Sequence, residues 1–207
     1  CSFNTPIAAV IFTHEAIIGH YSLRAFAPVT IAAVAGNAVA IHYGRFFDGF
    51  QNLTAPTELT LGQYPLFAIV GLIAGLFAIA YMRSIVFMGK TVKGTKIPLW
   101  SRPMLAGLAI GIVALWLPNL LGLVEETTSQ VIQDQGTEYV LQLLCLLILF
   151  KIAATALCLS CGMHGGVFGP ALCIGAMVGA ALAMAYDAEY YQIFALAGMG
   201  ACISSVV

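Results

Sequence analysis

The sequence has very little charge. Of its 207 residues, 8 are Lys or Arg and 9 are Asp or Glu, so charged residues make up only 8%, whereas about 25% is usual in a soluble domain. Hydrophobic residues make up 61%, and the mean hydropathy is +0.97. So few charges cannot cover the surface of a soluble fold of this size. The composition therefore indicates an integral membrane protein, and the uncharged runs described below indicate an all-α, multi-pass one.

The sequence also lacks the features of several other classes. Its hydrophobicity excludes intrinsic disorder. A net charge of −1 without a basic patch argues against nucleic-acid binding. The six cysteines lie mostly in apolar runs, which is typical of buried thiols rather than a disulfide framework. His14-Glu15 begins like the zinc motif HExxH, but Ile18 stands where the second His is needed. We therefore expect no metal and no cofactor.

Uncharged runs predict where the chain crosses a membrane, since a spanning helix needs about 20 mostly apolar residues. An apolar helix is also expected over Phe3–Ile18, because Asn4-Thr5-Pro6 supplies a cap and a first-turn proline. The chain starts at Cys1 and ends in an apolar run, so we expect it to be an internal piece of a longer membrane protein. The uncharged runs cover Ala25–Gly44, Leu59–Met82, Pro103–Val124, Tyr139–Tyr186 with the single charge of Lys151, and Tyr190–Val207.

The placement of the charges predicts an orientation. The segment Arg83–Arg102 holds five basic residues and no acid, whereas Glu125–Glu138 holds four acids and no base. Basic loops are retained on the cytoplasmic side of membranes. We therefore expect the first segment to face the cytoplasm and the second to face outward, in a cell membrane (plasma or inner).

One uncharged run is too long for a single spanning helix. Ile152–Tyr186 has 35 residues, which would extend about 52 Å as a helix, against a hydrocarbon core of about 30 Å. Within it, Ser160–Pro170 contains four glycines and a proline. Non-helical backbone at membrane depth is tolerated where it is buried in protein or lines a watery cavity. The sequence predicts a break there and a new helix beginning near Phe168–Pro170; a simple kink is the alternative.

A helix that begins inside a membrane presents unpaired N–H groups and the positive end of its dipole. Pro170 suits the first turn, and Gly165 and Gly166 would let the backbone turn tightly and a ligand approach closely. The run contains no charged side chain. A ligand there would be held by backbone dipoles, which favour an anion. Such weak binding suits conduction. Gly175 and Gly179 have the GxxxG spacing of helix packing.

The break resembles a known motif. Gly165-Gly166-Val167-Phe168-Gly169-Pro170 is similar to the GGxFxP anion-site motif of the CLC family of chloride channels and chloride/proton exchangers. The stretch 3–15, FNTPIAAVIFTHE, resembles the family's FNTPLAGVLF stretch with its following acid. The resemblance covers essentially the whole chain, in the family's order.

The resemblance implies a fold, a partner and a cargo. The fold would be part of the CLC-type inverted-repeat helical fold with membrane-interrupted helices. Residues 1–45 would end the first repeat and residues 59–207 would form most of the second, within one transmembrane domain. The family implies a homodimer in the lipid bilayer with one pathway for chloride or similar anions in each subunit. It also implies that the anion site comprises Gly165, Gly166, Val167, Phe168 and Pro170, with the amides of Val167 and Phe168 in contact with the anion.

Other elements of the family's pathway are expected outside this chain. The loops that carry the gating glutamate and the central serine would precede Cys1, and the late tyrosine would follow Val207. Proton-coupled members have a second acid after the FNTP stretch. Here Glu15 matches the first acid and Ala16 stands at the second, so the resemblance implies channel-like or weakly coupled transport. An exchanger in which His14 or Glu15 takes the proton is the alternative.

Two further residues have open roles. His164 adjoins the motif and could attract an anion once charged, since histidine titrates near neutrality, or could be an ordinary polar residue at the break. Lys151 could add positive potential to the pathway or could serve the structure. A membrane enzyme would need a nucleophile, base or metal set in one cavity, and the sequence offers none, so an enzyme or a non-transporting scaffold has less support.

Overall fold

The computed structural model describes residues 5–43, 64–116, 128, 131–132, 141–186 and 190–206. The chain divides into two compact units, residues 1–51 and residues 52–206, which we describe separately. All regular structure in the described residues is helical. Four helices, namely α2, α3, α6 and α7, are long and apolar enough to cross a membrane. The prediction of a multi-pass helical membrane protein is therefore confirmed.

The first unit contains α1 (Pro6–Phe12), a π-helix over Thr13–Ile18, and α2 (Leu23–His42). Pro6 occupies the first turn of α1 as expected, although the side chain of Thr5 forms no capping hydrogen bond. The predicted helix over Phe3–Ile18 is thus α-helical only in part, and its last six residues are wound as π-helix. Gly19 ends the π-helix with a φ of 74°, a left-handed conformation that favours glycine. The chain then turns into α2, which packs against α1.

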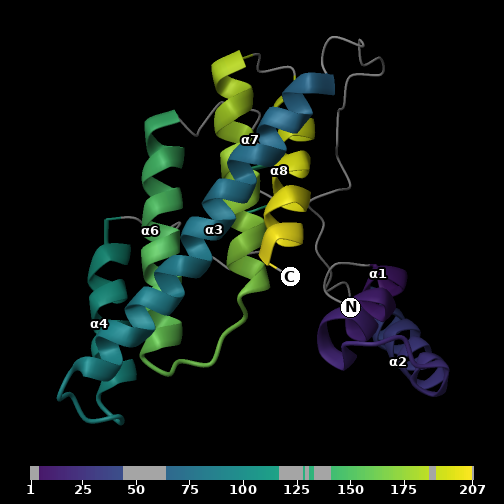
Figure 1. Cartoon of the computed structure of the whole chain (residues 1–207), viewed down its shortest axis with the longest axis horizontal. Coiled ribbons are helices and arrows are strands. Elements are labelled where there is room, and N and C mark those ends of the chain that lie inside the picture. Colours follow the sequence, from purple (N-terminus) through teal and green to yellow (C-terminus); the bar gives the residue numbers. More distant parts are fainter. Residues whose placement is uncertain are drawn as a thin grey trace. The chain divides into compact units, whose positions relative to one another are not determined.

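The second unit contains five helices among its described residues. They are α3 (Tyr64–Gly94), α4 (Arg102–Ala114), α6 (Leu141–Ser160), α7 (Phe168–Tyr186) and α8 (Tyr191–Val206). Figure 1 shows α3 crossing α7 and α8, with α6 beside α3 and α4 beside α6. The lone Lys151 does not interrupt α6.

Two helices differ in length from the spans predicted for them. Within the span predicted over Leu59–Met82, residues 64–82 belong to α3, which is 31 residues long and also includes Arg83, Lys90 and Lys93. Residues 59–63 lie outside the described residues. Part of the predicted basic loop is therefore helix. Conversely, α4 covers only the first part of the span predicted over Pro103–Val124 and ends at Ala114. Residues 117–127 and the outer acidic residues Glu125, Glu126, Asp134 and Glu138 lie outside the described residues.

The core of the second unit forms around α7, whose buried residues contact α3, α6 and α8. Glycines allow α7 and α8 to approach closely. A Cβ atom added to Gly175 would lie 2.5 Å from the carbonyl oxygen of Gly198, and one added to Gly179 would overlap the carbonyl of Phe194. The prediction that Gly175 and Gly179 serve helix packing is confirmed.

Candidate anion site at the break between α6 and α7

The chain leaves α6 through a Schellman motif. The amide of Met163 donates a hydrogen bond to the carbonyl of Cys158 (3.1 Å), and the amide of Gly162 donates to the carbonyl of Leu159 (3.2 Å). This pair of bonds requires a left-handed residue after the helix, and Gly162 has a φ of 85°. The break is thus an ordered helix end followed by a new helix, rather than a kink in one helix.

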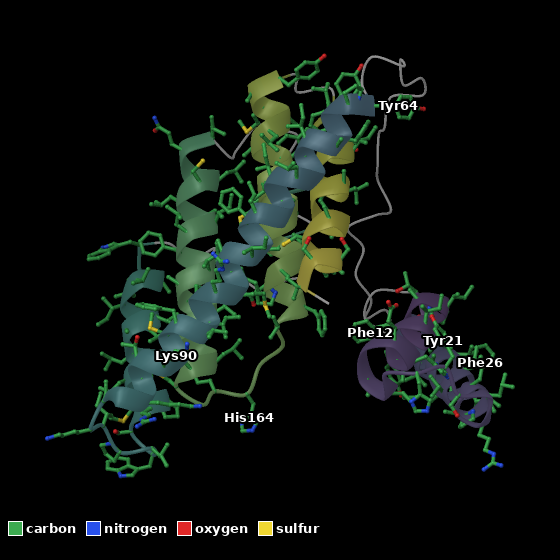
Figure 2. The ribbon with its side chains drawn as sticks, in the orientation of Figure 1. Phe12, Tyr21, Phe26, Tyr64, Lys90 and His164 are labelled. Atoms are coloured by element: carbon green, nitrogen blue, oxygen red, sulfur yellow. The ribbon has the colours of Figure 1, made fainter. Side chains whose placement is uncertain are left out.

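The two bulky residues after Gly162 take opposite directions. Met163 packs against the buried cluster of Val92 on α3, Ala106 on α4 and Cys161, and an apolar contact of this residue commonly accompanies a Schellman motif. His164 is exposed, and Figure 2 shows its side chain pointing away from the helices of its unit. The large side chain of Met163 therefore packs at the C-terminal end of α6. His164 lies two residues before Gly166, with its imidazole accessible.

The predicted anion-binding residues lie in the linker and the first turn of α7. Gly165 and Gly166 are exposed, and a Cβ atom added to Gly166 would have no neighbour within 4 Å. Phe168 is the first residue of α7 and Pro170 is its third, with Phe168 still 38% exposed. The carbonyl of Val167 accepts the amide of Ala171 at 3.3 Å. The backbone therefore changes here from an open glycine pair to a helix N-terminus.

A tyrosine that the sequence reasoning missed contacts this segment. Tyr81 lies on α3, is 0% exposed, and donates a hydrogen bond from its hydroxyl to the carbonyl of Val167 at 3.1 Å. In the sequence it lies in an apolar run, where a tyrosine looks like an ordinary core residue. Its partner is 86 positions away, so only the fold brings the two together. The carbonyl of Val167 thus accepts hydrogen bonds from two donors, Tyr81 and Ala171.

Other contacts fix α6 beside α3. The hydroxyl of Ser160, the last residue of α6, donates to the carbonyl of Ile85 on α3 at 3.4 Å. Lys151 is 7% exposed and follows Leu144, Leu147 and Ile148 at helical spacing on the buried face of α6. Its side chain is therefore held within the helix packing rather than at a helix end.

The residues considered for proton transfer lie in the first unit. His14 is 1% exposed, and its ring stacks on Tyr21 with centroids 5.8 Å apart. Its Nδ1 lies 3.0 Å from the carbonyl oxygen of Val10, and its Nε2 lies 3.3 Å from that of Ser22. A carbonyl oxygen can only accept a hydrogen bond. A doubly protonated ring would therefore donate to both carbonyls, and a neutral ring would donate to only one. Glu15 is exposed.

Metal ligands and cysteines can be checked directly in the described residues. No group of three or more His, Cys, Asp or Glu among them could hold a metal ion. The five cysteines of the described part, Cys145, Cys158, Cys161, Cys173 and Cys202, are free thiols. This agrees with the prediction of thiols rather than a disulfide framework for those five positions.

The helices and the break define a class: a polytopic helical membrane protein in which an apolar helix begins after a glycine-rich interruption. Comparison with known families then makes the class specific. The model of the voltage gated chloride channel family matches residues 1–207. The chain therefore belongs to this family, the CLC family of anion transporters and channels.

Curated relatives carry both kinds of name found in the family. The H(+)/Cl(-) exchange transporter ClcA of Vibrio campbellii is 27% identical over 231 residues, covering 100% of this chain and 46% of the relative. ClcA of Vibrio cholerae is 28% identical over 225 residues, with the same coverage. The chloride channel protein CLC-f of Arabidopsis thaliana is 27% identical over 226 residues, covering 99% of this chain and 29% of the relative. The chain thus spans less than half the length of these relatives.

Proposed function

We propose that this chain supplies the GGxFxP part of a chloride pathway, in which backbone amides at the start of α7 hold the anion. The observation that carries the proposal is the ordered transition at Gly165–Phe168, where an exposed glycine pair leads directly into an apolar helix. Helix N-termini favour anions because their first N–H groups have no partner within the helix and because the macrodipole is positive there.

The composition around the site supports weak, reversible binding. α7 has no acidic residue in its first turn to repel an anion, and no basic residue follows in the helix. Dipoles alone bind more weakly than a full charge, and conduction requires that the ion also leave. The open space at Gly166 lets an ion approach the backbone. Lys151, buried on α6, would contribute long-range positive potential rather than direct ligation.

We propose channel-like or weakly proton-coupled transport, because Ala16 cannot carry a proton where coupled members have an acid. The alternative is a chloride/proton exchanger, and the two relatives that are named as exchange transporters support it. His14 favours that alternative in one respect, since its ring has a carbonyl oxygen near each nitrogen and only the protonated ring can donate to both. We further propose a homodimer in a cell membrane, as the family implies.

Two measurements on the full-length protein in liposomes test the transport proposal. Liposomes that hold the protein should release chloride, and a simultaneous pH recording should show little or no proton movement. A fixed stoichiometric proton flux driven by the chloride gradient would overturn the channel-like assignment and support the exchanger. Absence of any anion flux from well-folded protein would overturn both.

A glycine substitution tests the site itself. Gly166→Val places a branched side chain where the anion is proposed to approach, and no neighbouring atom within 4 Å opposes it. Chloride binding should weaken while the melting temperature changes little. The matched control is Gly107→Val on α4, which also has open space at its Cβ. Unchanged chloride affinity in Gly166→Val would show that the anion site lies elsewhere.

A further inference from the structure

We propose that Tyr81 is a positioning residue for the anion site, because its hydroxyl fixes the peptide unit that carries the amide of Phe168. This inference rests on the proposed function, since it concerns the direction of an amide assigned there to the anion. It adds a residue on α3, far from the motif in sequence.

The contact is specific and buried. Tyr81 is 0% exposed, and its hydroxyl donates to the carbonyl of Val167 at 3.1 Å. Burying a tyrosine hydroxyl in an apolar core is costly unless the hydroxyl has a hydrogen-bond partner. The partner it finds is a backbone carbonyl within the motif rather than one on α3. A phenylalanine would fill the same space without that requirement.

The geometry of the peptide bond transmits this contact to the next amide. The carbonyl of Val167 and the N–H of Phe168 belong to one planar trans unit, in which they point in opposite directions. Holding the carbonyl toward Tyr81 therefore directs the N–H of Phe168 to the other side. Rotation of this unit would swing both groups together and would break the bond to Tyr81.

The hydrogen bond from Tyr81 also makes the amide of Phe168 a stronger hydrogen-bond donor. The carbonyl of Val167 accepts the amide of Ala171 at 3.3 Å as well as Tyr81. Hydrogen bonds in a chain polarise one another, by about 10–30% per bond. A peptide unit whose oxygen accepts two donors therefore has a more positive N–H. Tyr81 thus orients the donor and strengthens it.

The test is chloride binding to the full-length protein in detergent, measured by calorimetry, with Tyr81→Phe. This change removes one oxygen atom and keeps the packing. Since a net hydrogen bond is worth about a factor of 2 to 12 in an equilibrium constant, we expect chloride affinity to fall about three- to tenfold. Incorporation of 3-fluorotyrosine at position 81 keeps a hydroxyl donor and should restore affinity to at least the native value.

A control separates positioning from simple helix tethering. Ser160→Ala removes another side-chain hydrogen bond to a backbone carbonyl, the one from Ser160 to Ile85, which also joins α3 to a neighbouring helix. It should lower the melting temperature without changing chloride affinity. If Tyr81→Phe behaves in the same way, with lower stability and native affinity, Tyr81 is only a tether and the inference is wrong.

The outcomes also separate this inference from the proposed site. If Gly166→Val weakens chloride binding and Tyr81→Phe does not, the site stands and only the role of Tyr81 fails. If neither substitution changes chloride affinity, the site at the start of α7 and the role of Tyr81 fail together. Weakened binding in both variants, with recovery by 3-fluorotyrosine, supports both.

Discussion

The packing of α7 on α8 predicts that an added methyl group at Gly175 will destabilise the protein. A Cβ atom there would lie 2.5 Å from the carbonyl oxygen of Gly198 and 2.8 Å from the Cα of Met199. Both atoms belong to the backbone of α8, so no side-chain rotation can relieve the contact. The reciprocal substitution at Gly198 would press on the carbonyl oxygen of Gly175.

The change in the free energy of unfolding is the difference between the cost of overpacking and the gain in helix propensity. Ordinary van der Waals separation is about 3.5 Å, so the two helices must move apart by about 1 Å at this point. Overpacking of this kind costs about 1–3 kcal/mol, and rigid backbone neighbours favour the upper end. Replacing a helical glycine by alanine recovers about 1 kcal/mol of helix propensity. The net destabilisation of Gly175→Ala should be about 2 kcal/mol.

The assay is thermal unfolding of the full-length protein in detergent. The melting midpoint of Gly175→Ala should fall by roughly 4 °C. Gly200→Ala on α8 is the matched control, because its Cβ would meet nothing within 4 Å, and its midpoint should stay the same or rise. Gly175→Ala with Gly198→Ala should cost less than the sum of the two, since one separation accommodates both methyl groups. A native midpoint in Gly175→Ala would refute the close-packing argument.

Two further substitutions test the break. Gly162→Ala forces a side chain into the left-handed conformation at φ 85°, so the free energy of unfolding should fall by about 1–2 kcal/mol. Thermal melting measures this change, with Gly107→Ala as the control because a Cβ atom there has open space. His164→Gln removes the accessible imidazole beside the proposed site. If a charged His164 attracts the anion, native chloride flux should rise as the pH falls below 7 and the variant should lose that rise; identical flux curves between pH 5 and 8 would exclude this role.

Hydropathy located the helices well where a helix is bounded by polar or helix-breaking residues. The run Ala25–Gly44 corresponds to α2, and the break in the long apolar run falls where glycine and proline gather. The same reasoning placed the end of α3 too early, at Arg83. Long basic side chains can extend from a helix into water, so a charge at the membrane boundary does not end a helix. Helix ends depend on local capping, which hydropathy does not report.

The motif supplied the residues of the candidate site but not their supports. Gly162 followed by Met163 is the sequence pattern of a Schellman end with an apolar residue after it, and this signal was present in the sequence. Tyr81 gave no such signal. A tyrosine in an apolar run is typical of core packing, and its contact with Val167 joins positions 86 residues apart. Only the crossing of α3 over α7 reveals it (Figure 1).

A site made of backbone dipoles depends on the direction of its donors more than a charged side chain does. A lysine ammonium attracts an anion from any side, but an N–H group weakens steeply as a donor when it turns away. The proposed anion site therefore needs a helix that cannot rotate. Glycine packing against α8 fixes the body of α7, and the hydroxyl of Tyr81 fixes the peptide before its first residue. Tyr81→Phe should accordingly lower anion affinity more than removal of the exposed charge at Lys90 or Lys93 does, and Gly175→Ala should lower stability more.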